Sequence, residues 1–470
     1  MKTIDVRDGL FSNFSAAWED VAARLGVTHM PTDEKIGTHQ KALTINLDGS
    51  VFGSFAEIGA GQEVAHWFLT VGGASGTVAK TISAYDKEVS DDLYGRGTRY
   101  VSEPRLEAMM ESEWKQLLAE LEASRGLTTR FFTYVDTVSA RNFAGTNECH
   151  GWVGLRFQQV PGAPASEVIL HINLQDPTNL QQQEAVGILG VNLIYAAFRY
   201  VGSPEEFLAR VYEDLSLGRL EIDLVDVRGP AFEKWDKRQL HASLVTNGYA
   251  EAVAFTAEGQ LIPPTELLYK KALVLAPGVF ETASDIHGQL IQSTLAQLPA
   301  EELEQSKGSL GLFCLPGQLM IAGGPAPTTE DLVRHVDSLQ KLGYGTLIFR
   351  AKELYTMSTF VSRYTKSQVY FAVGLSVLIH ALQDRYKSLA GALLEGTARL
   401  FSQNVRLSVY PMSETALKAR LEELGANEWT YEVTDGLVYV EHLHPVEPIK
   451  FLFGYLVACG FVVSARPAAA

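Results

Sequence analysis

The order of apolar and polar positions predicts a first unit in which strands and helices are mixed. Apolar, β-branched residues at 42–47 and 51–56 flank Asp48-Gly49, a dipeptide typical of a tight turn, so we expect a β-hairpin there. Helical periodicity is expected at 62–68, 77–93 and 105–124, and strands at 129–138, 150–158 and 167–174. The hairpin requires antiparallel pairing whereas later crossovers favour parallel pairing, so the sheet is predicted to be mixed.

A second pattern begins near residue 328, where strand and helix signals alternate three times. Strands are expected at 345–349, 369–375 and 405–410, with helices between them. The pattern loosens between 276 and 327, where Pro and Gly are frequent. The sequence therefore predicts an α/β protein: a peripheral segment at 1–40 with a short helix at 14–25, a mixed-sheet α+β domain at 41–275, a linker region at 276–327, and a smaller Rossmann-like parallel α/β domain at 328–470.

Composition narrows the class of protein. A chain of 470 residues exceeds the roughly 250–300 at which one core stops growing, which favours two domains. A net charge of -16 without a Lys/Arg-rich run argues against nucleic acid and against a membrane as partners. The first residues have no apolar signal region, and the three cysteines form no CxxC pair, so we expect a cytoplasmic protein without a disulfide framework or metal centre.

A glycine-rich turn follows the strand at 51–56. Glu57, Gly59 and Gly61 resemble the acidic-x-Gly-x-Gly-x-Gly loop of S-adenosylmethionine methyltransferases, with Glu63 in place of the third glycine. Two interpretations stay open: a site for a nucleotide-derived ligand without phosphate, or a tight turn between strand and helix. Lys80 is a further candidate binding residue for an anion, although its spacing is not that of a phosphate-binding loop, and it is expected on a helix.

A second cluster combines residues that carry acid–base chemistry. Glu148 and His150 enter the strand at 150–158, and Asp136 and Arg141 end the preceding strand and begin its loop, so these four are the candidate catalytic residues. Successive residues of a strand point to opposite faces, which argues against a metal held by this cluster. A third candidate region is the predicted carboxyl edge of the parallel sheet, at Arg350–Glu353.

Four runs of residues carry a resemblance to a known family. The segments 55–64, 76–86, 147–154 and 268–271 resemble a widespread uncharacterised bacterial family whose members receive automatic labels such as nicotinate-nucleotide adenylyltransferase or TonB-dependent receptor. The His-x-Gly-His loop of the adenylyltransferases is absent from the sequence, and the receptors are signal-bearing barrels. The resemblance therefore implies no mechanism and no cofactor.

These observations support two functional hypotheses. The first is a cytosolic small-molecule enzyme or ligand-binding protein that uses a nucleotide-derived ligand; its cofactor is unknown. The second is a non-catalytic oligomeric scaffold or regulatory subunit, assembled as a homo-oligomer through apolar helices. A structure discriminates between them by showing whether the candidate residues line one cavity.

Overall fold

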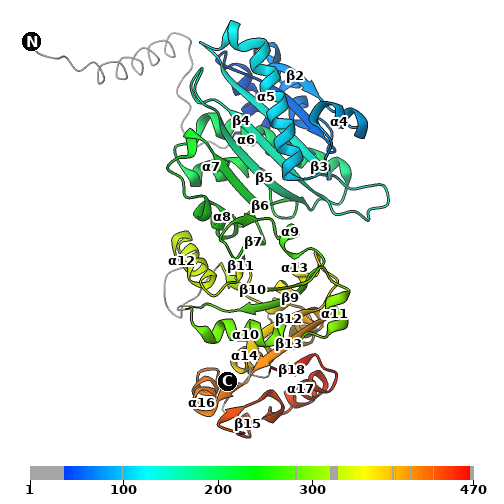
Figure 1. The fold of residues 1–470 in the computed structure, drawn as a ribbon, viewed down its shortest axis with the longest axis vertical. Coiled ribbons are helices and arrows are strands. Elements are labelled where there is room, and N and C mark those ends of the chain that lie inside the picture. Colours follow the sequence, from blue (N-terminus) through cyan, green and yellow to red (C-terminus); the bar gives the residue numbers. More distant parts are fainter. Residues whose placement is uncertain are drawn as a thin grey trace, which may run out of the picture.

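The chain forms two β-sheets that follow one another along the long axis of the molecule (Figure 1). The computed structural model describes residues 36–465, except 98, 281–282, 318–326, 384–385, 387, 402–403 and 427. The helix expected at 14–25 and most of the peripheral segment 1–40 lie outside the described residues.

The first sheet has six strands in the order β2-β1-β3-β4-β5-β6. Its strands are β1 (Val51–Ile58), β2 (Val78–Ile82), β3 (Arg130–Ser139), β4 (His150–Phe157), β5 (Ser166–Leu174) and β6 (Leu220–Arg228). Strand β1 pairs in parallel with β2 and β3, whereas β3 to β6 pair antiparallel in sequence. The sheet is mixed, as the sequence predicts.

Helices cover both faces of this sheet. One face packs against α2 (Thr38–Asn46), α3 (Glu63–Thr70), α6 (Asn179–Arg199) and α7 (Pro204–Val211), whose apolar side chains share a core with Phe55 and Val153. The other face packs against α4 (Lys87–Tyr94) and α5 (Glu103–Arg125), with Trp152 and Val135 in the core between them. Figure 1 shows the long α5 lying across the strands.

Two local predictions in this unit are wrong. Residues 42–46 belong to helix α2, so no hairpin precedes β1. The buried positions of α2 are Thr38, Lys41, Ala42, Ile45 and Asn46. This spacing is helical, but three of the five residues are polar, which hides the period from an apolar pattern. The helix expected at 77–93 is instead strand β2 followed by α4, so Lys80 lies on a strand.

The second sheet has eight strands in the order β18-β13-β12-β9-β10-β11-β7-β8. Its strands are β7 (Ala252–Phe255), β8 (Leu261–Ile262), β9 (Ala272–Pro277), β10 (Ser309–Pro316), β11 (Gly345–Phe349), β12 (Val369–Gly374), β13 (Val405–Tyr410) and β18 (Val462–Ser464). The strands from β18 to β11 are parallel, and β7 and β8 add an antiparallel edge. The chain is thus an α/β protein whose second sheet is mostly parallel.

The helices of the second unit connect these strands. They are α8 (Lys237–Thr246), α9 (Pro264–Leu268), α10 (Asp285–Leu295), α11 (Ala300–Glu304), α12 (Thr329–Gln340), α13 (Leu354–Val361), α14 (Leu375–Gln383), α15 (Ala392–Leu400), α16 (Glu414–Glu423) and α17 (Ile449–Ala458). Two short ribbons, β14 (Met412–Ser413) with β16 (Leu437–Val438) and β15 (Thr430–Tyr431) with β17 (Leu443–His444), complete the described part. None of the described helices has both the length and the apolar character needed to cross a membrane.

The segment expected to be a linker contributes to this sheet. Residues 276–327 contain the end of β9, helices α10 and α11, and strand β10, which lies between β9 and β11. Residues 318–326 of the segment lie outside the described part. The chain passes from the first sheet to the second between β6 and β7, through residues 229–251. The Pro and Gly residues of 276–327 therefore mark connections within a sheet.

Candidate functional site

Polar side chains alternate along two buried strands of the first sheet. His171 and Asn173 lie two residues apart on β5, and Glu221 and Asp223 lie two residues apart on β6. Each of the four side chains belongs to a buried residue. Two-residue spacing places each pair on one face of its strand, and Asn173 is the register partner of Glu221. The two strands thus present a polar patch beneath the protein surface.

Three of these side chains form a hydrogen-bonded chain with His150. Nδ1 of His171 lies 2.6 Å from Oδ1 of Asp223, and Nε2 of His171 lies 3.1 Å from Nδ1 of His150. The amide of Asn173 donates to Oδ2 of Asp223 at 2.7 Å. The edge of the Trp152 ring system packs against the imidazole of His171, with ring centroids 4.9 Å apart. Asp223 and His171 are therefore held in place by groups other than a ligand.

The direction of these hydrogen bonds follows from the chemistry of the groups. A carboxylate only accepts, so Nδ1–H of His171 donates to Asp223. Nε2 of His171 is then the acceptor for Nδ1–H of His150. This assignment leaves Nε2 of His150 as an acceptor with a lone pair, which is the arrangement of a general base supported by a second imidazole and a carboxylate.

Burial changes the proton affinities around this chain. Desolvation, and then the neighbouring His171, lower the pKa of His150 to about 4. Its imidazole is therefore neutral at neutral pH. Desolvation and the charge of Asp223 raise the pKa of Glu221 to about 8. The two carboxyl groups of β6 thus have separate roles near pH 7: Asp223 accepts from His171 while Glu221 keeps its proton.

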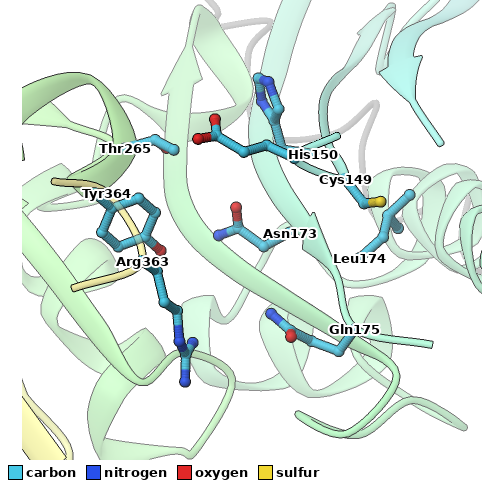
Figure 2. A pocket seen from close by; sticks show the side chains of 9 residues that line it. Cys149, His150, Asn173, Leu174, Gln175, Thr265, Arg363 and Tyr364 are labelled. Carbon is cyan, nitrogen blue, oxygen red and sulfur yellow. The ribbon is translucent and has the colours of Figure 1, made fainter. Parts of the chain in front are cut away.

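The chain of histidines ends at a pocket between the two sheets. The pocket has a volume of about 150 Å³ and is lined by Glu148, Cys149, His150, Asn173, Leu174, Gln175, Thr265, Arg363 and Tyr364. Figure 2 shows Thr265, Tyr364 and Arg363 on one side and His150, Cys149 and Leu174 on the other, with Asn173 between them. The first side comes from the second sheet's connections, so neither unit forms the pocket alone.

One polar atom of this lining has no partner among the described residues. Thr265 is only 9% exposed, and its buried Oγ1 atom forms no hydrogen bond. An unsatisfied buried hydroxyl costs free energy, roughly 1–3 kcal/mol. A ligand in the pocket that offers a donor or an acceptor would remove this cost.

A larger groove of about 570 Å³ adjoins the pocket, and the two share Glu148, Arg363 and Tyr364. The rest of its lining is Tyr269, Lys270, Gln305, Thr365, Lys366, Ser367, Gln368 and Asn404. These residues precede β9, β10, β12 and β13, so the groove lies at the amino ends of the parallel strands. The carboxyl edge of that sheet, where the sequence suggested Arg350–Glu353, is the opposite one.

Two residues shared by both cavities come from the loop before β12. Nη1 of Arg363 forms an ion pair of 2.8 Å with Glu251, which fixes the guanidinium beside the pocket. Burial, with the charges of Glu221 and Asp223, raises the pKa of Tyr364 well above its ordinary value. The tyrosine is therefore a neutral hydroxyl at the junction of the two cavities.

The structure separates the candidate catalytic residues into three places. Glu148 and His150 line the pocket. Asp136 lies on the opposite face of the first sheet, where its carboxylate accepts from the backbone N–H of Ile58 at 3.1 Å and from the Tyr134 hydroxyl at 3.2 Å. Arg141 is exposed in the loop after β3, and its backbone N–H donates to Gln182. A single cavity does not contain all four.

The glycine-rich turn has a structural explanation in contacts within the protein. Both carboxylate oxygens of Glu57 accept backbone N–H groups at the start of α3, from Val64 at 3.0 Å and from Ala65 at 2.9 Å. Gly59 has φ +102, and a Cβ there would lie 1.8 Å from the carbonyl oxygen of Val138. The close approach that requires Gly59 is thus that of strand β3.

The remaining candidates also have partners within the protein. Gly61 has φ +78, a backbone conformation that favours glycine, and a Cβ there would meet Gln183 at 3.4 Å. Nζ of Lys80 forms an ion pair of 2.5 Å with the buried Glu113 and donates to Gln116. Lys80 therefore ties β2 to helix α5.

Sequence reasoning missed most of the residues that surround the pocket. Asn173, Asp223, Thr265 and Arg363 are not among the residues that the sequence singled out. A signal was present for part of them, because residues 171 and 173 in β5 and 221 and 223 in β6 interrupt apolar strands at two-residue spacing. Polar residues on the inward face of two paired strands indicate a buried network.

Within the described residues, no group of three or more His, Cys, Asp or Glu side chains is placed to hold a metal ion. The side chains that line the pocket supply a neutral imidazole, a carboxylate, a thiol, a guanidinium, two hydroxyls and two carboxamides. This set suits proton transfer to and from an anionic or polar ligand.

Fold and site define an α/β protein with a polar pocket between two sheets. No protein-family model and no curated protein matches the chain. Similar solved structures include the competence/damage-inducible protein CihA from Agrobacterium tumefaciens, 18% identical, with 35% of this chain and 98% of that chain covered and a TM-score of 0.26. A CinA superfamily protein from Enterobacter cloacae is 12% identical, with 36% and 98% covered and a TM-score of 0.27. At these TM-scores the similarity carries no information on ligand or reaction.

Proposed function

We propose that this chain is a small-molecule enzyme whose reaction takes place in the pocket between the two sheets, with His150 as the general base. The observation that carries the proposal is the hydrogen-bonded chain from Asp223 through His171 to His150, which ends at a residue that lines the pocket. A buried carboxylate and two imidazoles in line cost desolvation free energy, and proton transfer is a function that uses them.

The roles of the residues follow from their positions. Nε2 of His150 takes a proton from the ligand, and the carboxylate of Asp223 stabilises the positive charge that forms, while His171 holds the His150 ring in place through its hydrogen bond. Arg363 holds a negatively charged group of the ligand, and Oγ1 of Thr265 exchanges a hydrogen bond with it. Asp223 and His171 act through His150, so they are positioning residues.

A nucleotide-derived ligand, expected from the sequence, is consistent with this site. Tyr269 and Tyr364 offer aromatic rings in the adjoining groove, and Lys270 and Arg363 offer positive charge. Ligand pockets typically have volumes of about 300–1,000 Å³, and the groove alone falls in that range. We place the ligand here because the carboxylate of Glu57 is already occupied by backbone N–H groups.

The test is consumption of compounds from pools of nucleotides, nucleosides and small carboxylic acids, followed by NMR. We expect the wild-type protein to convert at least one compound, and His150→Gln to lower that rate about a hundredfold or more. His39→Gln is the matched control, because His39 is exposed on α2. Equal rates in the wild-type protein and His150→Gln would refute the assignment of the base.

A second variant separates ligand binding from catalysis. Thr265→Val keeps the shape of the side chain and removes the unsatisfied hydroxyl, so we expect the unliganded protein to be as stable as the wild type or slightly more stable. The same variant should raise KM for a converted compound and leave kcat nearly unchanged. A large loss of stability in Thr265→Val would show that the hydroxyl has a structural partner instead.

A second candidate function is supported by one surface feature. Phe451 and Tyr455 lie one turn apart on α17 and are 66% and 60% exposed. Neighbouring exposed aromatic side chains are a common feature of protein interfaces, which agrees with a homo-oligomeric scaffold. Light scattering on the wild-type protein and on Phe451→Ser/Tyr455→Ser tests it: a dimer that becomes a monomer in the variant supports assembly through α17, and a monomer in both refutes it.

A further inference from the structure

The groove beside the pocket gathers positive charge in a strongly acidic protein. Lys270, Arg363 and Lys366 line it together with one carboxylate, that of Glu148, while Glu251 pairs with Arg363 from outside the lining. The chain as a whole carries a net charge of -16. The net charge at the groove is therefore positive, whereas the net charge of the whole chain is negative. The groove attracts an anion that most of the surface repels.

Lys270 shares one aromatic ring with Lys307, a lysine outside the lining of the groove. Nζ of Lys270 lies 5.0 Å from the centroid of the Tyr269 ring, and Nζ of Lys307 lies 4.7 Å from the same centroid. Two ammonium groups on one ring repel each other. The Tyr269 ring carries no formal charge, so its contact with Lys270 does not neutralise the ammonium group.

The backbone around the groove is held in fixed and uncommon conformations. Lys270 has φ 57 and Asn404 has φ 60, in the left-handed region that few residues other than glycine adopt. The backbone N–H of Lys270 donates to the carbonyl of Tyr364, and the N–H of Lys307 donates to the carbonyl of Lys270. The side-chain amide of Asn404 donates to the carbonyl of Lys366. The groove is thus preformed, and strained backbone of this kind is often found at binding sites.

Hydroxyl and amide groups accompany the cations. Ser367 and Gln368 lie in the same loop as Arg363 and Lys366, and Gln305 lines the groove from the connection before β10. The hydroxyl of Thr365 donates to the carbonyl of Lys271, so it is not among these donors. Positive charge with several neutral donors is the set of groups that binds phosphate oxygens in proteins. A carboxylate has fewer oxygens and would use fewer of these donors.

From these observations we infer that the groove lined by Lys270, Arg363 and Lys366 is a phosphate subsite, and that the ligand of the neighbouring pocket is a phosphorylated small molecule. Arg363 lines both cavities, which places the phosphate next to the part of the ligand that reaches His150. The identity of the reacting part rests on the proposed function, whereas the phosphate subsite stands on the groove alone.

The experiment measures binding of inorganic phosphate and of pyrophosphate to the full-length protein by titration calorimetry, at constant ionic strength and with acetate as the comparison anion. We expect phosphate and pyrophosphate to bind more tightly than acetate. Lys270→Gln/Lys366→Gln should weaken phosphate binding roughly tenfold or more, because two charged partners are lost.

The matched control is Lys352→Gln, which removes an exposed lysine after β11, at the carboxyl edge of the same sheet. We expect this variant to bind phosphate as the wild type does. Loss of binding in Lys352→Gln with no change in the double variant would overturn the inference and place the anion at the carboxyl edge. Equal binding of phosphate and acetate would overturn it as well.

His150→Gln keeps the two proposals distinguishable. It leaves the groove unchanged, so phosphate binding should persist in it. If phosphate does not bind but turnover depends on His150, only the phosphate subsite is refuted. If phosphate binding depends on the lysines but no turnover depends on His150, only the proposed reaction is refuted. Circular dichroism on each variant excludes unfolding as the cause.

Discussion

Glu57 on β1 and Asp136 on β3 are register partners on parallel strands, and each residue is only 1% exposed. Two carboxyl groups buried at neighbouring positions cannot both ionise without repulsion. Desolvation raises the pKa of Glu57 to about 7, and desolvation together with Glu57 raises the pKa of Asp136 well above its ordinary value. The pair therefore links the stability of the first sheet to pH.

The sign of this linkage gives the first prediction. Glu57 has an ordinary pKa of 4.5 and a folded value of about 7, so the folded state binds the extra proton. The stability it contributes is complete below about pH 4.5 and is lost as the pH rises through 7. We expect Glu57→Gln to flatten the fall in the free energy of unfolding across this range, as measured by urea unfolding.

Glu57→Gln should also be less stable than the wild type at pH 5, because both oxygens of the carboxyl group accept backbone N–H groups whereas the amide nitrogen of glutamine cannot accept one. Glu120→Gln on the exposed face of α5 is the control and should follow the wild-type pH profile. A profile of Glu57→Gln parallel to that of the wild type would contradict the linkage.

The second prediction concerns the two glycines of the turn. Gly59→Ala places a Cβ against the Val138 carbonyl at φ +102, so it combines backbone strain with overpacking and should cost roughly 2–5 kcal/mol. Gly61→Ala has room, with Gln183 at 3.4 Å, and should cost only the left-handed strain of about 1–2 kcal/mol. Denaturant unfolding of both variants checks the order, and a larger loss in Gly61→Ala would show that the turn is shaped differently.

The third prediction is the titration of His150. Its pKa near 4 follows from burial and from His171, while Asp223 raises it. In an NMR titration of the imidazole Cε1–H signals we expect His150 to stay neutral down to about pH 5 in the wild type. Asp223→Asn should lower its pKa further, and His171→Gln should raise it. A wild-type value near 6.5 would contradict the burial of His150 and the effect of His171 on its pKa.

The fourth prediction compares a buried ion pair with an exposed one. Lys41 is 0% exposed, pairs with Glu213 at 2.6 Å and donates to Asn192 at 2.7 Å. Lys41→Met should destabilise the protein by about 3 kcal/mol, because it leaves buried polar groups without their partner. Lys115→Met removes the exposed pair with Glu111 and should cost less than about 1 kcal/mol.

A double variant completes this comparison. Lys41→Met/Glu213→Gln should recover part of the loss, since the second substitution removes the carboxylate that the first leaves without the lysine. Thermal unfolding at constant pH gives the values. Equal losses in Lys41→Met and Lys115→Met would contradict the burial of the pair.

The sequence alone determined the class of fold, α/β, and the alternation of strands and helices in the second sheet. Strands β11 and β12 are mostly apolar runs, and helices separate β11, β12 and β13; such an alternation forms parallel sheets whose two faces are covered. The sequence also indicated Glu148 and His150, since residues that transfer protons are recognisable by type.

The tertiary structure decided which buried polar residues contact one another, which the order of apolar and polar positions does not predict. Helix α2 was read as a strand because Lys41 and Asn46 are buried polar residues, and Lys41 is buried only because Asn192 and Glu213, distant in sequence, receive its charge. The same holds for the site: Arg363 and Thr265 meet His150 only where the connections of one sheet pack against the edge of another. The periodicity of apolar residues indicates which face of a helix or strand is buried. The partner of a buried polar group is often distant in the sequence, so only the folded structure shows which residue it is.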